Sequence, residues 1–288
     1  MLNPTGIGRS AAWHLSAVQT LAAARAVERT EHVAHSGRVK PWFWGVANSP
    51  CVAITGASGA LGQALLLRWH QRGARLIGLS CGRRDLLLRD ESGQAIPLRN
   101  ETWCVGDEDR LRPLLAEVDI LVLNHGINVY GGRSLEACQR SLEVNALSSW
   151  RLLELYAAVV AERQAADPAS ARPQAEVWIN TSEAEIQPAL SPLYELSKRL
   201  LGQLVSLRAL DLAGPQLRIR RLVLGPFRSA LNPVGVMGAG FVAGQILRQA
   251  DLGCNLIIVT PNPLTFVLMP MATLGRWLYF RLLTRPSA

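Results

Sequence analysis

The segment Thr55-Gly56-Ala57-Ser58-Gly59-Ala60-Leu61-Gly62 joins the apolar run Cys51–Thr55 to residues 61–69, whose apolar side chains have helical spacing. A short apolar run that ends at a glycine turn predicts a buried parallel strand. Glycines spaced three apart permit a tight turn, a close backbone approach to a ligand and close helix packing. The N-terminus of the following helix attracts phosphate groups. We therefore expect a strand–turn–helix unit that binds the pyrophosphate of a dinucleotide.

The same alternation of apolar runs and helical patterns continues along the chain. Strands that alternate with helices predict a doubly wound parallel sheet, α/β in class, with about seven strands and helices on both faces. After the first strand, the pattern predicts strands at residues 75–79, 102–105, 119–123, 176–180, 218–224 and 255–259. After the first helix, it predicts helices at residues 110–117, 142–160, 193–210 and 236–249.

The 288 residues suit one large domain with extensions. We expect residues 1–48 to be an extension that is partly helical or disordered, and residues 49–263 to be the nucleotide-binding domain. Residues 264–288 should form an apolar, basic helix. Five scattered cysteines, none in a C-x-x-C pair, suit reduced thiols in a cytosolic protein and indicate no metal site.

The formal net charge of +8 is concentrated at the two ends of the chain. Residues 1–50 carry five basic and two acidic side chains, and residues 264–288 carry three arginines and no acid. A nearly neutral centre argues against a nucleic-acid-binding body. Basic ends suit contact with an anionic membrane surface, and the alternative is that they only aid solubility.

A second motif combines a tyrosine, a lysine and a serine. Tyr194 and Lys198 are four residues apart, so they lie one above the other on a helix face. Ser182 precedes Tyr194 by twelve residues, at the end of a predicted strand. Such a pair is common by chance, but with the upstream serine and the glycine turn it becomes a specific signal.

On these residues, the chain resembles the short-chain dehydrogenase/reductase family from about residue 50 to residue 263. The resemblance implies that Tyr194 exchanges a proton with the substrate oxygen and that Lys198 lowers the pKa of the phenol and holds the nicotinamide ribose. It also implies that Ser182 orients the substrate oxygen, with Thr181 as the alternative, and that Asn145 holds a water in a proton relay. The implied activity is the interconversion of a carbonyl and an alcohol.

The resemblance also assigns the coenzyme site. No acid stands at the end of the second strand, and two arginines follow it, which favours NADP(H) over NAD(H), although Asp85 lies close by. His125 takes the place of an alanine in the family turn, and we expect a structural role for it. The expected coenzyme contacts are Thr55, Gly56, Ser58, Gly59, Leu61, Gly62, Ser80, Arg83, Arg84, Asp107, Asn124, Gly126, Tyr194, Lys198 and Gly225.

The C-terminal segment suggests a lipid setting. Residues 271–283 are apolar apart from two arginines, which suits a helix lying in a membrane interface or one packed on protein. The segments 181–185, 192–198 and 224–227 resemble the reductase module found fused to sterol-desaturase-type proteins. We therefore expect a lipophilic small-molecule substrate and a cytoplasmic protein, peripheral to the inner face of a membrane. Homo-oligomers are common in the family.

Two alternatives and one ambiguity remain open at this point. The protein is either an oxidoreductase, a non-catalytic NADP-binding sensor or scaffold, or an epimerase or dehydratase of the extended branch of the family. The glycine spacing T-G-x-x-G-x-x-G is typical of that branch, but a short C-terminal region is not. Glu183 and Glu185, next to Ser182, either bind a polar substrate group or point to solvent.

Overall fold

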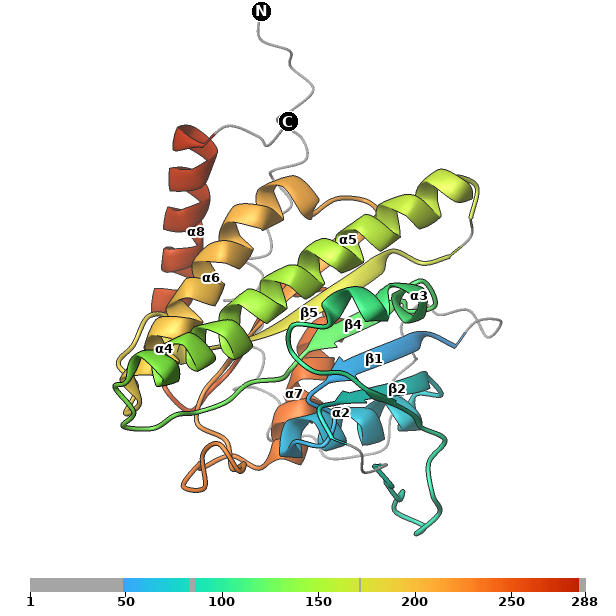
Figure 1. The fold of residues 1–288 in the computed structure, drawn as a ribbon, viewed down its shortest axis with the longest axis horizontal. Helices are drawn as coiled ribbons and strands as arrows, with labels where there is room; N and C mark the ends of the chain where they lie inside the picture. The colour runs from blue at the N-terminus through green and yellow to red at the C-terminus, as the bar shows by residue number, and fades with distance from the viewer. Residues whose placement is uncertain (1–48, 83–85, 171, 285–288) are drawn as a thin grey trace, which may run out of the picture.

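The fold is built on a single parallel sheet of seven strands in the order β3-β2-β1-β4-β5-β6-β7, seen in a computed structural model that describes residues 49–82, 86–170 and 172–284 (Figure 1). All neighbouring strands are parallel. The predicted doubly wound sheet is confirmed. The strands are β1 Cys51–Thr55, β2 Arg75–Ser80, β3 Arg99–Thr102, β4 Ile120–Leu123, β5 Ala175–Ser182, β6 Leu217–Leu224 and β7 Leu256–Val259.

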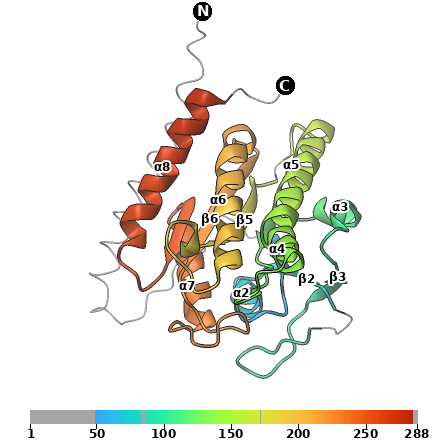
Figure 2. The ribbon, with the colours of Figure 1, turned by 60° about the vertical axis from the view of Figure 1, so that its left-hand side comes forward.

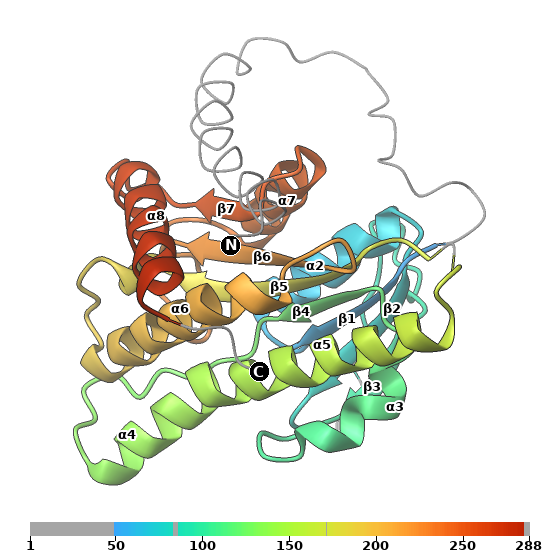
Figure 3. The ribbon, with the colours of Figure 1, turned by 90° about the horizontal axis from the view of Figure 1, so that it is seen from above.

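Helices cover both faces of the sheet, and each face has its own core. On one face, α3, α5 and α6 pack over the sheet with α8 beside α6, as Figure 2 shows, whereas α2 and α7 pack on the other face (Figure 3). None of the described helices is long and apolar enough to cross a membrane. The helices are α2 Ala60–Gln71, η2 Glu108–Leu111, α3 Arg112–Leu115, α4 Leu135–Leu142, η3 Glu143–Leu147, α5 Ser148–Ala166, η4 Glu183–Glu185, α6 Pro192–Leu212, α7 Ala239–Asp251 and α8 Thr265–Leu283.

Two predicted elements differ from the structure. The third strand was expected at residues 102–105, but β3 is Arg99–Thr102, because this edge strand is polar and half-exposed and the apolar residues follow it. Trp103 is buried just past the strand end, where its backbone N–H donates to the carbonyl of Ser80 at 3.0 Å. The helix predicted at residues 142–160 is part of a longer run, α4 to α5, interrupted by the π-helical turn η3.

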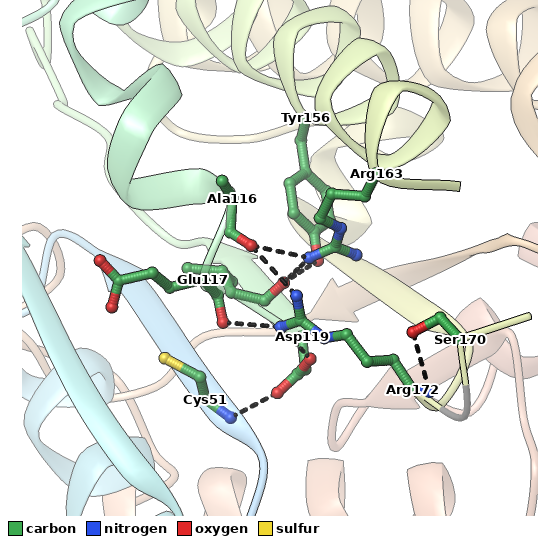
Figure 4. A network of polar contacts seen from close by, with 9 residues as sticks. Cys51, Ala116, Glu117, Asp119, Tyr156, Arg163, Ser170 and Arg172 are labelled. Carbon is green, nitrogen blue, oxygen red and sulfur yellow. Dashed lines mark hydrogen bonds and ion pairs between the residues drawn. The ribbon is translucent and has the colours of Figure 1, made fainter. Parts of the chain in front are cut away.

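A polar network ties the sheet together at the edge where β1 and β4 begin (Figure 4). The carboxylate of Asp119 accepts from the backbone N–H of Cys51 at 2.8 Å and from the guanidinium of Arg172 at 2.8 Å. Arg163 and Tyr156 of α5 donate to the carbonyl of Val118 at 2.6 and 3.1 Å. These bonds satisfy buried backbone groups and attach α5 to the sheet at the N-terminal ends of its strands. The candidate site lies at the opposite, C-terminal ends of the same strands.

Candidate functional site

The glycine turn after β1 has the geometry of an anion cradle. Gly56 has a φ of +63°, and a Cβ there would lie 2.9 Å from the backbone of His125. A Cβ on Gly62 would lie 2.4 Å from the carbonyl of Gly56. Gly59 is the N-cap of α2 and makes no side-chain cap, so the first N–H groups of this helix face the turn. Such a turn fits the diphosphate of a dinucleotide, which backbone N–H groups and the helix dipole would hold.

A chain of amides connects this turn to the lysine. Asn124, directly after β4, accepts at its side-chain oxygen from Asn180 Nδ2 at 2.9 Å, and its own Nδ2 lies 3.5 Å from the carbonyl of Gly56. Lys198 Nζ donates to the backbone carbonyl of Asn180 at 2.9 Å. The ends of β1, β4 and β5 therefore meet the lysine of α6 where the strand order reverses, between β1 and β4. This is where doubly wound folds bind their ligands.

Ser182 and Tyr194 meet at the end of β5. Ser182 is the last residue of that strand, and its hydroxyl donates to the carbonyl of Leu224 at 3.4 Å and accepts from the backbone N–H of Ala184 at 3.2 Å. Tyr194 lies in the first turn of α6, and hydrogen bonding with Ser182 lowers its pKa. Thr181 instead turns its hydroxyl into the sheet and donates to the carbonyl of Leu222 at 3.2 Å. Neighbouring residues of a strand point to opposite faces, so only one of the two can reach the tyrosine. Ser182 as the residue that orients the substrate oxygen stays a prediction.

Burial controls the protonation of the tyrosine and the lysine. Burial raises the pKa of Tyr194, although the hydrogen bond with Ser182 lowers it. Lys198 Nζ lies 5.7 Å from the centroid of the tyrosine ring, and burial lowers the pKa of Lys198 to about 8, with the carboxylate of Glu185 acting in the opposite direction. Desolvation is the largest influence on the pKa of the phenol at this geometry, and the expectation that Lys198 favours the phenolate stays a prediction.

Asn145 sits inside the π-helical turn, fully buried. Its side-chain oxygen accepts from the N–H of Ile127 at 2.8 Å, and its Nδ2 donates to the carbonyl of Ile127 at 3.0 Å and to Ser197 Oγ at 2.9 Å. The carboxamide thus binds the loop after β4 to α6, one residue from Lys198. π-helical turns are rare and occur frequently at functional sites.

The chain resembles known proteins in fold and in sequence, although no protein-family model matches it. The bulky-bulky ketone specific alcohol dehydrogenase of Comamonas testosteroni has a similar structure, with a TM-score of 0.64 and 18% identity over 84% of this chain and 98% of that one. A short-chain dehydrogenase of Sphingobium yanoikuyae, solved with NADPH, gives 0.61 and 19% over 83% and 98%.

The fold is that of the short-chain dehydrogenases and reductases. The resemblance to this family, expected from the sequence, is confirmed in the fold. A much more similar sequence is the monoglucosyldiacylglycerol epimerase of Synechocystis sp. (strain ATCC 27184 / PCC 6803 / Kazusa), 49% identical over 238 residues, which are 82% of this chain and 55% of that protein. The chain therefore spans about half the length of this curated relative. The share of this chain that is matched is large enough to include both Gly56 and Lys198 wherever the match begins.

The other expected contacts of the short-chain fold lie along the same edge of the sheet. Ser80 ends β2, and Gly126 and Gly225 follow β4 and β6. A Cβ on Gly225 would lie 2.3 Å from Thr260 Oγ1, so this turn needs glycine. Asp107 lies after β3, where its exposed carboxylate is 3.9 Å from Arg110. Arg83 and Arg84 lie outside the described residues, as do Asp85 and the expected helix within residues 1–48. The described residues contain no group of His, Cys, Asp and Glu that could hold a metal ion.

His125 has partners at both ring nitrogens. Nδ1 lies 2.8 Å from Thr55 Oγ1, and Nε2 lies 2.7 Å from Ser148 Oγ, whose hydroxyl donates to the carbonyl of Val144. The Thr55 hydroxyl in turn donates to the carbonyl of Val122 at 3.2 Å, and which ring nitrogen carries the proton depends on the tautomer of His125. The ring also stands edge-on to Trp103, with centroids 4.9 Å apart. Burial, followed by the charge of Lys198, lowers the pKa of His125 to about 3. A neutral imidazole with both nitrogens occupied supports the expected structural role.

We expect this histidine to make the fold sensitive to acid. The unfolded chain binds a proton near pH 6.5 and the folded chain only near pH 3, so stability falls as the pH drops below 6.5, by about 1.4 kcal/mol per pH unit from this group. The free energy of unfolding, measured with urea at several pH values between 6.5 and 4.5, should fall less steeply with falling pH in His125→Gln than in the wild type. His70→Gln, on α2, is the control. Equal slopes for the wild type and His125→Gln would show that His125 is protonated in the folded state.

Glu183 and Glu185 do not simply point to solvent, because both carboxylates have partners within the protein. Glu183 accepts hydrogen bonds from Thr260 Oγ1 at 2.6 Å and from Thr265 Oγ1 at 3.1 Å. Glu185 is completely buried, and its Oε2 lies 2.6 Å from Arg276 Nη1 on α8 and 3.7 Å from Arg221 Nη1. Both carboxylates therefore attach the turn after Ser182 to the C-terminal part of the chain, Glu183 to Thr260 and Thr265 and Glu185 to Arg276 within α8.

Sequence reasoning missed the residues that support the motif. Asn180 holds the lysine, Ser197 holds Asn145, and Ser148 holds His125. Asn180 could have been suspected, because it stands two residues before Ser182 near the end of a strand. The two serines carry no sequence signal, since they are small residues within helices.

Proposed function

We propose that this protein is an NADP(H)-dependent epimerase that inverts one carbon in the glucosyl group of a diacylglycerol lipid. The observation that carries the proposal is the 49% identity to monoglucosyldiacylglycerol epimerase over a stretch that includes the glycine turn and the Ser182–Tyr194–Lys198 group. The oxidoreductase chemistry expected from the sequence is kept as the chemical step. What changes is that the oxidation is followed by a reduction on the same molecule.

Epimerisation at a carbon that bears a hydrogen and a hydroxyl can proceed through a ketone. A nicotinamide coenzyme held at the glycine turn would supply the hydride acceptor and, in the return step, the hydride donor. Tyr194 takes the hydroxyl proton as the C–H bond breaks and the carbonyl forms. After the sugar presents its other face, the C–H bond forms again and Tyr194 returns the proton to the oxygen. Hydrogen and electrons balance, so no coenzyme is consumed overall.

The neighbours of Tyr194 suit this cycle. Ser182, hydrogen-bonded to the phenol, would orient the substrate oxygen. A cation favours the phenolate that forms in passing, and Lys198 is held beside the ring for that purpose. Asn145 would complete the proton relay through water. Burial raises the pKa of Tyr194, which keeps the proton on the phenol before the return step and makes the phenolate that the oxidation needs harder to form, so that step would depend on Lys198.

The preference for NADP(H) rests on sequence around the end of β2. No acid is present there to bind a ribose hydroxyl, and Arg83 and Arg84 follow, which suit a 2′-phosphate. The structurally similar dehydrogenase of Sphingobium yanoikuyae holds NADPH. We also propose that the protein works as a peripheral protein at the cytoplasmic face of a membrane, where a diacylglycerol lipid is found, and that residues 49–263 form the catalytic domain.

The test is turnover with a trace of coenzyme. The protein is incubated with vesicles of monoglucosyldiacylglycerol and phosphatidylcholine, with NADP⁺ or NAD⁺ present at far less than the amount of lipid. We expect many epimerised lipids for each NADP⁺, no net absorbance change at 340 nm, and a slower reaction with NAD⁺. Stoichiometric NADPH together with a keto-lipid would show a simple oxidoreductase. Tight NADPH binding with no product, also with a panel of carbonyl compounds, would support the sensor alternative.

A further inference from the structure

The outer side of α8 carries a continuous row of exposed apolar side chains. Their spacing of four, three, four and four residues places them on one face of the helix. This α8 row consists of Val267, Met271, Leu274, Leu278 and Leu282, with exposed fractions of 52, 64, 41, 43 and 76%. The opposite side of the helix is occupied, because Met269 is buried against β6 and β7. Among the described residues, nothing covers the row. An exposed apolar face of this size marks an interaction surface.

The row begins beside the candidate site and is fixed relative to it. Thr265, the first residue of α8, donates to Glu183, which directly follows Ser182. About three turns further along, Arg276 forms the buried ion pair with Glu185. Gln187, in the same loop, also donates to Thr265 Oγ1, at 2.7 Å. The direction in which the α8 row faces is therefore set by the turn that carries the serine.

The charged residues of α8 itself are all basic. The sequence has no acidic residue after Asp251, whereas Arg276, Arg281 and Arg285 follow it. Arg276 is used inside the protein, and Arg281 is exposed on α8. A helix with apolar residues on its outer side and basic residues near its end is suited to lie in the interface of an anionic bilayer, where buried apolar area and electrostatic attraction add together.

We infer that the α8 row docks on an anionic lipid bilayer and thereby holds the mouth of the site at the lipid headgroups. The inference rests on the proposed function, because a diacylglycerol lipid keeps its acyl chains in the bilayer and only its sugar can enter a site lined by Ser182 and Tyr194. Because α8 is also attached to the turn after Ser182, docking of α8 would bring the sugar of the lipid to the site while the acyl chains stay in the bilayer.

Flotation tests the inference with the full chain. Vesicles of phosphatidylglycerol and phosphatidylcholine in equal amounts should carry the protein upward in a density gradient, and vesicles of phosphatidylcholine alone should carry less. The variant Met271→Gln/Leu278→Gln/Leu282→Gln should bind at least about tenfold more weakly, because three apolar side chains no longer enter the interface. The matched control Leu87→Gln/Leu135→Gln/Leu252→Gln changes three exposed leucines elsewhere and should float like the wild type.

Three results would overturn the inference. The full chain stays at the bottom of the gradient, as it would if residues 1–48 cover the row. The α8 variant floats as well as the control. The α8 variant changes the sedimentation coefficient, which would show that a second copy occupies the row. Failure of the proposed function is distinguishable, since protein that floats but does not epimerise the lipid keeps the docking surface, and protein that epimerises without floating loses only that surface.

Discussion

We expect Tyr194→Phe to lower the rate of the proposed epimerisation by about 10²- to 10⁴-fold, the usual contribution of a positioned acid–base group. The substitution removes one oxygen, whose hydrogen bond is to Ser182. The ring stays in the first turn of α6, and the glycine turn is not touched. We therefore expect NADPH to bind with unchanged affinity, measured by fluorescence titration, while product formation on lipid vesicles almost disappears.

Tyr156→Phe is the matched control for this variant. It makes the same chemical change at the other edge of the sheet, where the hydroxyl donates to the carbonyl of Val118. It should lower stability somewhat and leave the turnover of the folded protein unchanged. If Tyr194→Phe kept more than a tenth of the wild-type rate with the same lipid, the phenol would not be the proton donor and the mechanism would have to be abandoned.

Arg276→Ala lowers the free energy of unfolding by about 3 kcal/mol. Removing one partner of a buried ion pair typically costs 3–5 kcal/mol, because the other charge is left in a medium of low dielectric. Glu185 is completely buried, and the side chain of Arg276 is only 11% exposed. The lower end of the range is expected, because Arg221 stays 3.7 Å from the same carboxylate oxygen. Urea denaturation followed by circular dichroism measures the change.

Two further variants make this result specific. Arg276→Lys keeps the charge and should recover part of the loss, although an ammonium does not match a guanidinium in geometry. Arg281→Ala removes an exposed arginine from the same helix and should change stability by less than about 0.5 kcal/mol. Equal effects of Arg276→Ala and Arg281→Ala would mean that the ion pair between Glu185 and Arg276 does not stabilise the folded protein.

The sequence was sufficient for the sheet because its inner strands are buried on both faces. Runs such as Cys51–Thr55 and Ile120–Leu123 are fully buried, so their apolar character alone marks them. The edge strand β3 has no such mark, since it is polar and half-exposed, and the neighbouring Trp103 drew the prediction three residues too far along the chain. Helix positions were predicted from the helical spacing of apolar residues, whereas helix ends were predicted less well.

The site was predictable where its residues are close in sequence. The spacing of Tyr194 and Lys198 on one helix face, and the position of Ser182 at a strand end, placed these side chains together. The roles of Glu183 and Glu185 could not be predicted, because their partners, Thr260 and Arg276, are 77 and 91 residues away. Contacts of this kind depend on how α8 folds back over β7, which no local pattern records.

Each hydrogen bond of the π-helical turn around Asn145 spans one residue more than a bond of an α-helix. We expect that deleting one residue of this turn would let α4 and α5 join as one α-helix and would turn the Asn145 carboxamide away from Ile127 and Ser197. The loop after β4 would then lose its side-chain connection to α6.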